Sequence, residues 1–389
     1  MSTITVEKLR LTGALQVPVL TQAEINALSP EQGQIVYNSD INYIQIYGPF
    51  NNWGRTDIGT GNDLWDIENQ TNNGTNSMKF LGLGSRGDKE GPNIAMMSAS
   101  YQNSAGAWAG NTRFLYQGAF EGYQTVAIPK DGLYRFEANG ARGGKCQRYG
   151  DTVLYGARCT GDFYLTKDQR ITMAVGIGGG DYSSPHGNEA GGGGGTWVYD
   201  STNNNLLMVA GGAGGSAGNT WGTSCTRDSN IGRGQSTQGV QGFTCSYTVS
   251  APSVGEGGNA NGNYHGGAGG GYNSDGANGG THCSNVAGGK GYQSGLVGGI
   301  GDSCYTSGGL ANSGGFGGGG GGNLSGPGGG GGYTGGCTAG QWSSYSTHGG
   351  GGGSYNAATT NNSISAGANT GGEGGYTGAG YVVMTWISE

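Results

Sequence analysis

Apolar and polar residues alternate in short runs through the middle and at the very end of this chain. The alternating runs are Thr125–Ile128, Gly132–Ala138, Phe163–Leu165, Ile171–Ile177, Trp197–Tyr199, Leu206–Val209 and Tyr381–Ile387. A period of two places every second side chain on one face of a strand, which is typical of antiparallel sheets with one buried face. Turn-forming residues separate the runs. The pattern predicts an all-β antiparallel sandwich, with strands in residues 92–210 and 379–389.

The pattern changes over residues 211–378, between the penultimate and last predicted strands. Glycine runs alternate there with segments rich in Tyr, Asn, Ser and Thr. The runs are 211–215, 266–271, 317–322, 328–332 and 349–353. The whole chain holds 92 Gly in 389 residues, whereas ordinary proteins hold about 7%. Collagen is excluded, because it needs Gly at every third position and abundant Pro, and this chain has 8 Pro.

Two structures remain for the glycine block. A flexible Gly/Ser linker would have few aromatic residues, but this block contains many, among them Trp221, Phe243, Tyr272, Phe316 and Trp342. The alternative is an ordered bundle of extended polyglycine helices, with three residues per turn and a rise of about 3.1 Å. Such helices have no internal hydrogen bonds, so their backbone groups must pair with neighbouring helices. We expect this bundle over 211–378, inserted in the sandwich.

Residues 1–60 have their own pattern and predict a separate small module. Thr21 and Glu24 form a capping box that opens a short helix toward Leu28, and Pro30 ends it. Two β-rich runs around an Asn/Ser/Asp turn, Gln34–Tyr37 and Tyr43–Tyr47, predict a hairpin, with Trp53 within reach of its face. The polar, Asn-rich stretch 61–91 predicts a linker, which leaves 92–389 as the glycine-rich domain.

Composition excludes several partners. Charged residues make up 11% of the chain and the net charge is −7, with no Lys/Arg cluster. Nucleic acids and anionic membranes need concentrated positive charge, so neither is expected as a partner. No segment is long and apolar enough for membrane insertion, and the first residues lack the apolar core of a secretory signal. We expect synthesis in a host cytoplasm and release by lysis or assembly.

The sequence offers few groups for catalysis or metal binding. Seven Cys occur without a C-x-x-C pair. They are either free thiols or local disulfides, and the pairs with the shortest loops are Cys146–Cys159, Cys225–Cys245 and Cys283–Cys304. The four His lack metal-ligand spacing, and the G-x-S-x-G match at 214–218 lacks a strand–turn–helix context. Arg86-Gly87-Asp88 spells an integrin tripeptide, which a glycine-rich chain matches easily by chance. We expect no enzyme, no metal and no cofactor.

Two parts of the chain resemble known families. The stretch LSPEQGQIVYNSDINYIQIYGPFNNW resembles a module of phage tail-fibre and other virion proteins. GLYRFEANGARGG, GGGGGTWVYD, LLMVAGGAGG, GGFGGGGGGNLSGPGGGGGYTGG and GGGGGSYN follow, in order, the glycine-rich domain of the anaplastic lymphoma kinase ectodomain. That resemblance covers about residues 120–389 and implies a TNF-like (jelly-roll-like) sandwich carrying a bundle of polyglycine type II helices. Tail-tip adhesins of T-even-like phages have a similar architecture, in which loops between the helices contact the bacterial receptor.

The segments between glycine runs are the candidate binding site, because Tyr, Ser, Gly and Asn are also the residues of antibody paratopes. The receptor-binding candidates are Trp221, Tyr264, His265, Tyr305, Trp342 and Tyr345. The competing interpretation is that these rings pack the bundle. Candidates for attachment to other virion proteins are Tyr37, Tyr43, Tyr47 and Trp53.

The sequence therefore favours a phage fibre or tail-tip adhesin, displayed on the virion, that binds a host surface protein or glycan. Two alternatives stay open: a capsid decoration or head-fibre protein without a specific receptor, and a cellular extracellular ligand-binding protein. A homotrimer would be common among fibres, although no heptad repeat specifies one.

Overall fold

The computed structural model divides the chain into two compact units, Met1–Asn69 with Ser104–Thr112, and Gln70–Asn103 with Arg113–Glu389. It describes residues 18–29, 35–38, 43–47, 53–56, 77–93, 96–97, 121–128, 130–146, 153–182, 189–217, 233–235, 249–261, 265–280, 286–302, 312–323, 326–339, 348–367 and 378–389. Across these ranges the structure is mostly β, with almost no helix.

The first unit contains a small sheet and the helix that the capping box predicts. Helix α1 (Gln22–Asn26) begins after Thr21, whose backbone N–H donates to Glu24 Oε2 at 2.7 Å while Thr21 Oγ1 accepts from the Glu24 amide at 3.3 Å. The sheet has the order β1-β2-β3-β4, and the predicted hairpin is confirmed as the antiparallel pair β2–β3. The strands are β1 (Val19–Leu20), β2 (Ile35–Asn38), β3 (Tyr43–Tyr47) and β4 (Trp53–Thr56).

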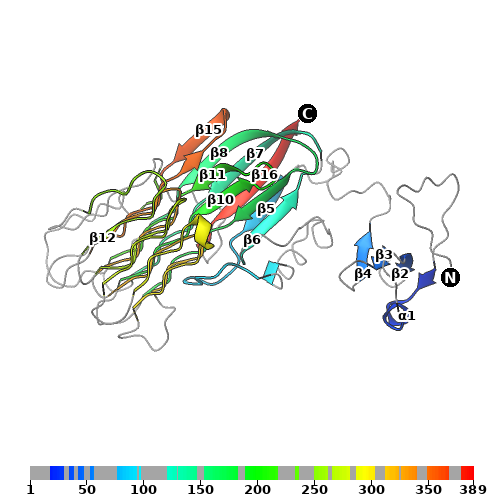
Figure 1. Ribbon diagram of the computed structural model, residues 1–389, viewed down its shortest axis with the longest axis horizontal. Coiled ribbons are helices and arrows are strands. Elements are labelled where there is room, and N and C mark those ends of the chain that lie inside the picture. The colour runs from blue at the N-terminus through cyan, green and yellow to red at the C-terminus, as the bar shows by residue number, and fades with distance from the viewer. Residues whose placement is uncertain are drawn as a thin grey trace. The chain divides into compact units, whose positions relative to one another are not determined.

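The second unit contains two five-stranded antiparallel sheets that pack together as a β-sandwich, which confirms the predicted antiparallel sandwich (Figure 1). The first sheet has the order β14-β11-β10-β9-β6 and the second β15-β8-β7-β16-β5. The strands are β5 (Ser77–Leu81), β6 (Tyr123–Ala127), β7 (Gly132–Asn139), β8 (Arg158–Leu165), β9 (Arg170–Ala174), β10 (Thr196–Asp200), β11 (Asn205–Ala210), β14 (Tyr355–Asn356), β15 (Thr360–Ser365) and β16 (Tyr381–Ser388).

The alternation in the sequence explains how the sheets bury one face. In β7, Tyr134, Phe136 and Ala138 are fully buried between the sheets, while the residues between them are half-exposed. Side-chain amides also bridge the sheets near their edges. Gln124 Nε2 in β6 donates to the carbonyl oxygen of Leu81 in β5 at 3.0 Å, which satisfies a backbone group at an edge strand.

Within the described residues, five strands of the second unit lie where the sequence predicted none: β5, β12 (Ala260–Asn261), β13 (Thr338–Ala339), β14 and β15. β5 falls within the predicted linker 61–91, and Ser77–Leu81 pairs residue by residue with β16, so the linker prediction is wrong from Ser77 onward. β14 and β15 fall within the predicted glycine bundle. The residues of β15 are almost all polar and mostly exposed, because β15 is an edge strand, so it carries no apolar alternation for the sequence to reveal.

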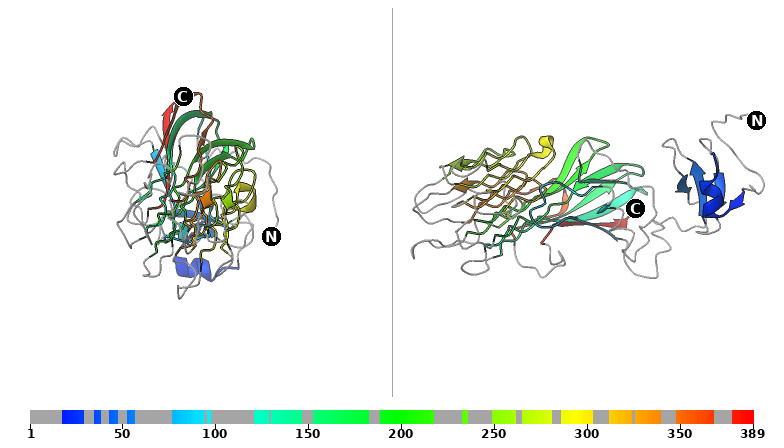
Figure 2. Two further views of the ribbon diagram at one scale, coloured as in Figure 1. Left: turned by 90° about the vertical axis from the view of Figure 1, so that its left-hand side faces the viewer. Right: turned by 90° about the horizontal axis from the view of Figure 1, so that it is seen from below.

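Beyond one end of the sheets, glycine-rich segments form a lattice held by backbone hydrogen bonds. We call the described residues of 140–146, 175–182, 189–195, 211–217, 256–339 and 348–354 the glycine-rich lattice; these segments lie side by side and continue several strands (Figure 2). Most of them are buried. The predicted insertion 211–378 was therefore too narrow, because 140–146, 175–182 and 189–195 also belong to the lattice.

Hydrogen-bond partners in the lattice repeat every third residue. In segment 191–195 the first and fourth amides donate to 177–180, the second and fifth donate to 317–320, and the third donates to Ala213. Each glycine run therefore faces several neighbours in turn rather than one partner strand.

The run 328–333 follows the same rule. Its first and fourth amides donate to 190–193, its second and fifth to 267–270, and its third and sixth to 350–353. A Cβ added at Gly330 would lie 2.3 Å from the carbonyl oxygen of Gly212. The close approach of backbones explains why so many of these positions are glycine.

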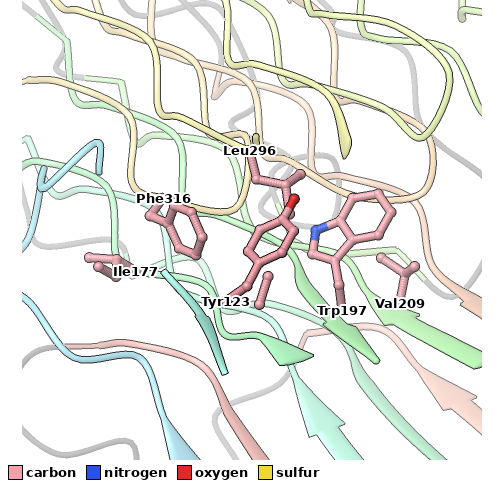
Figure 3. Packing of buried hydrophobic residues seen from close by; sticks show 7 residues of the cluster. Tyr123, Ile177, Trp197, Val209, Leu296 and Phe316 are labelled. Atoms are coloured by element: carbon pink, nitrogen blue, oxygen red, sulfur yellow. The ribbon is translucent and has the colours of Figure 1, made fainter. Parts of the chain in front are cut away.

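An aromatic layer joins the lattice to the first sheet (Figure 3). The fully buried members include Trp197 of β10 and Phe316 of the lattice, and Tyr123 of β6 is 7% exposed. Trp197 stacks on Tyr292 with ring centroids 5.3 Å apart. Aromatic residues of the glycine block therefore pack at this junction, as the competing interpretation of such rings predicts.

The structure also places two short motifs. Cys159 is a buried free thiol whose Sγ donates to the carbonyl oxygen of Val209, so the proposed Cys146–Cys159 disulfide is not formed. The Arg86 side chain pairs with Asp181, and the Gly87 amide donates to the Gly178 oxygen at 2.9 Å. The Arg-Gly-Asp tripeptide is thus bound into the lattice.

Candidate functional site at the distal end of the lattice

The lattice has one end at the sheets and one end away from them, which we call the distal end. Residue 195 directly precedes β10, and residue 211 directly follows β11, so both lie at the sheets. Glu189 and Ala217, at the opposite ends of those two segments, lie at the distal end. The Glu189 amide donates to the Asn323 oxygen at 2.9 Å, which places Asn323 there too.

Polar side chains are buried together at this distal end. We call them the distal polar layer. Its members are Glu189, Ser216, His265, Asp302, Asn312, Ser313, Asn323, Thr338 and His348, each between 0% and 8% exposed. Fully buried polar groups require hydrogen-bond partners, so this layer is an ordered part of the fold.

The side chains of the layer bind backbone groups of neighbouring lattice segments. Asn323 Nδ2 donates to the His265 oxygen at 3.0 Å, and Asn312 Nδ2 donates to the Gly322 oxygen at 3.1 Å. His348 Nδ1 accepts from the Ala217 amide at 3.2 Å. Here, where the glycine runs end, side-chain hydrogen bonds hold the segment ends in place.

Burial also affects the titration of the layer. Desolvation lowers the pKa of His265 below its ordinary value, although a hydrogen bond with the Gly266 oxygen partly opposes this shift. The imidazole is therefore held in its neutral form at neutral pH. Its ring is 8% exposed, which favours a packing role for this side chain over direct contact with a receptor.

The other receptor-binding candidates, Trp221, Tyr264, Tyr305, Trp342 and Tyr345, lie outside the described residues. Described residues at the distal end flank the segments that hold Tyr264, Tyr305, Trp342 and Tyr345, whereas the segment with Trp221 ends at Gly234 and Gln235, which lie near Gly211 and Gly352 toward the sheets. His265 follows Tyr264, Asp302 and Asn312 flank the segment with Tyr305, and His348 ends the segment with Trp342 and Tyr345. The distal end is therefore the place where these segments leave and re-enter the lattice.

The attachment candidates lie on three strands of the first unit. Tyr37 is in β2, Tyr43 and Tyr47 are in β3, and Trp53 is in β4, where it pairs with Tyr47. These four residues are thus brought onto one small sheet.

The sequence did not reveal the distal polar layer, although a signal for it exists. Several of its residues directly flank a glycine run: Asn323 follows Gly322, Ser216 follows Gly215, and His348 precedes Gly349. A polar residue at the boundary of each run is the common feature. When each glycine run is considered separately, these residues resemble ordinary polar loop residues.

The described part of the chain holds no cluster of three or more His, Cys, Asp or Glu that could bind a metal ion. Its helices are too short to cross a bilayer. Comparison with known proteins finds neither a matching family model nor a curated protein of similar sequence.

Proposed function

We propose that this chain is a phage virion fibre or tail-tip adhesin that binds a host surface protein or glycan at the distal end of its lattice. One observation carries the proposal. Described residues that flank the segments with Tyr264, Tyr305, Trp342 and Tyr345, among them His265, Asp302, Asn312 and His348, belong to the distal polar layer. Segments far apart in the sequence are thereby anchored at one end of the lattice.

The hydrogen-bond pattern supports polyglycine type II helices for the lattice. Amides three residues apart donate to the same neighbour in both 191–195 and 328–333, as expected for an extended helix of about three residues per turn without internal hydrogen bonds. The two packed sheets beside the lattice agree with the TNF-like sandwich that the resemblance implies. Both features resemble the architecture of the T-even-like tail-tip adhesins, in which the loops between the helices bind the receptor.

A rigid platform suits recognition by short loops. Binding costs free energy when side chains and loops must be ordered, and a lattice bonded in several directions holds the bases of these segments in place beforehand. Tyr and Trp on such segments offer a large contact area at small entropic cost. The first unit, with its tail-fibre-type sequence, would attach the protein to other virion proteins.

Trp342→Ala tests the proposal. Purified protein would be added to host cells, and its cell-bound fraction measured against its melting temperature. We expect Trp342→Ala to reduce adsorption with little change in melting temperature, because aromatic anchors dominate interface energies. Tyr164→Ala is the matched control, since Tyr164 is 63% exposed on the sandwich, away from the lattice. Normal adsorption of Trp342→Ala, together with a large loss of stability, would mean that the ring packs instead.

A further inference from the structure

A row of half-buried tyrosines crosses the junction between the first sheet and the lattice. We call it the tyrosine row; its members are Tyr199, Tyr272, Tyr292, Tyr333 and Tyr355. The rings come from β10, from β14 and from three separate lattice turns, so the fold assembles them from distant parts of the sequence.

Four rings of the row stack nearly parallel, whereas the Tyr199 ring is tilted by 42° against Tyr292. The Tyr355 and Tyr333 centroids are 4.7 Å apart with planes at 23°, those of Tyr333 and Tyr272 are 5.7 Å apart at 26°, and those of Tyr272 and Tyr292 are 5.5 Å apart at 27°. Because neighbouring rings cover each other's faces, the half-exposed part of the row consists mainly of ring edges and hydroxyl groups.

The phenol groups of the row influence one another's titration. Burial raises the pKa of Tyr333, and the neighbouring phenols Tyr355 and Tyr272 raise it further. The hydroxyl groups of Tyr272, Tyr333 and Tyr355 make no hydrogen bond to another described residue, whereas that of Tyr199 donates to Asn204. The row thus presents several hydroxyls able to bind an outside group.

Two carboxylates lie beside the row, and among the described residues only one of them is paired with a cation. Asp275 accepts from Lys290 at 2.7 Å, and the Glu256 carboxylate accepts from Asn273 Nδ2 and Ser274 Oγ. The negative charge of the two carboxylates disfavours an anion at the row. The exposed Asn273 adds a further amide to the polar margin.

We propose that the tyrosine row is a second binding surface, for an extended, uncharged polysaccharide. A neutral polysaccharide offers hydroxyl groups at regular intervals along its length, which matches a line of phenol hydroxyls better than a single pocket would. Rings fixed by stacking and by the lattice lose little freedom on binding. The surface lies at the sheet end of the lattice and is separate from the distal end. Its biological setting, a polysaccharide coat around the receptor, rests on the proposed function.

The experiment measures the retardation of the full-length protein in native gels that contain dextran, hydroxyethylcellulose, galactomannan or mannan. We expect retardation in at least one neutral polymer and none in hyaluronate, which is anionic. The combined variant Tyr272→Phe, Tyr333→Phe and Tyr355→Phe keeps the stacked rings but removes three hydroxyls, so its affinity should fall about tenfold or more. Tyr164→Phe, which removes a hydroxyl elsewhere, is the matched control.

The inference is overturned if none of the four neutral polymers retards the protein, or if the combined Phe variant binds as tightly as the wild type. Near-ultraviolet circular dichroism checks that the ring stack of this variant is intact. Failure of the proposed function looks different. In that case Trp342→Ala would adsorb to cells normally, while retardation by the neutral polymer and its loss in the Phe variant would remain.

Discussion

Gly330→Ala adds one methyl group in the middle of the lattice. The new Cβ would lie 2.3 Å from the Gly212 oxygen and 2.8 Å from the backbone carbons of Gly212 and Ala213. Real Cβ atoms essentially never approach so closely, and backbone atoms cannot move aside as a flexible side chain can. We therefore expect the segments on this side of Gly330 to be pushed apart.

The magnitude follows from the bonds that this displacement strains. The Gly330 amide donates to Gly350 at 2.9 Å, the Gly330 oxygen accepts from Gly336 at 2.8 Å, and the adjacent Gly212 amide donates to Gly331 at 2.7 Å. Weakening two or three such bonds costs about 0.5–1.5 kcal/mol each, and overpacking a dense interior costs about 1–3 kcal/mol. Replacing Gly by Ala also lowers the conformational entropy of the unfolded chain, which offsets the loss of stability by about 0.4–1 kcal/mol. Summed, these ranges give a net loss in unfolding free energy of about 1–7 kcal/mol, about 4 at their midpoints, and a larger loss for Gly330→Val.

Equilibrium unfolding in guanidinium chloride measures this loss. Ala277→Val is the control, because it adds carbon atoms at a half-exposed lattice position that already holds a Cβ, and it should change stability by less than about 1 kcal/mol. If Gly330→Ala unfolded within about 0.5 kcal/mol of the wild type, the lattice would not be close-packed at this position, and the steric reasoning would fail.

Two further predictions concern the domain boundary and pH. A chain that starts at residue 70 should keep the melting temperature of the second unit, whereas one that starts at 92 should melt lower because it lacks β5 and the Gly87 hydrogen bond; equal melting temperatures would contradict this. His265, whose pKa burial lowers from 6.5 in the folded state, binds a proton more readily in the unfolded chain, so stability should fall as pH drops below about 6.5. His265→Gln should weaken this dependence in pH-resolved melting, and an unchanged pH profile would refute the assignment.

Much of the sandwich was predictable because the sequence pattern that marks each strand lies within that strand itself. β7 buries alternate residues, so a period of two marks it in the sequence, whereas β10 and β11 are short apolar runs buried at most of their positions. The capping box at Thr21 is equally local, since both partners lie within one helical turn. β15 escaped prediction because an exposed edge strand needs no apolar face.

The lattice and its distal end depend on contacts between distant residues. Whether 189–195 joins the lattice is decided by partners near residues 180, 213 and 320, and no pattern within the segment reveals them. The distal polar layer was missed for the same reason, because its members become neighbours only when the glycine runs align. Of the receptor candidates, only His265 lies among the described residues, and its burial is a property of the assembled layer.

The direction of the lattice segments has a mechanical consequence. They run from the sheets to the distal end, and their hydrogen bonds lie across them to several neighbours. Tension between the distal end and the strands of the sandwich would act along the segments, so it would load many of these bonds in shear at the same moment. Bonds loaded together must break together, whereas the bonds of a peeled hairpin break one after another. Forced unfolding is governed by the rate of unfolding rather than by equilibrium stability, so a lattice of this kind can resist pulling even at ordinary thermodynamic stability.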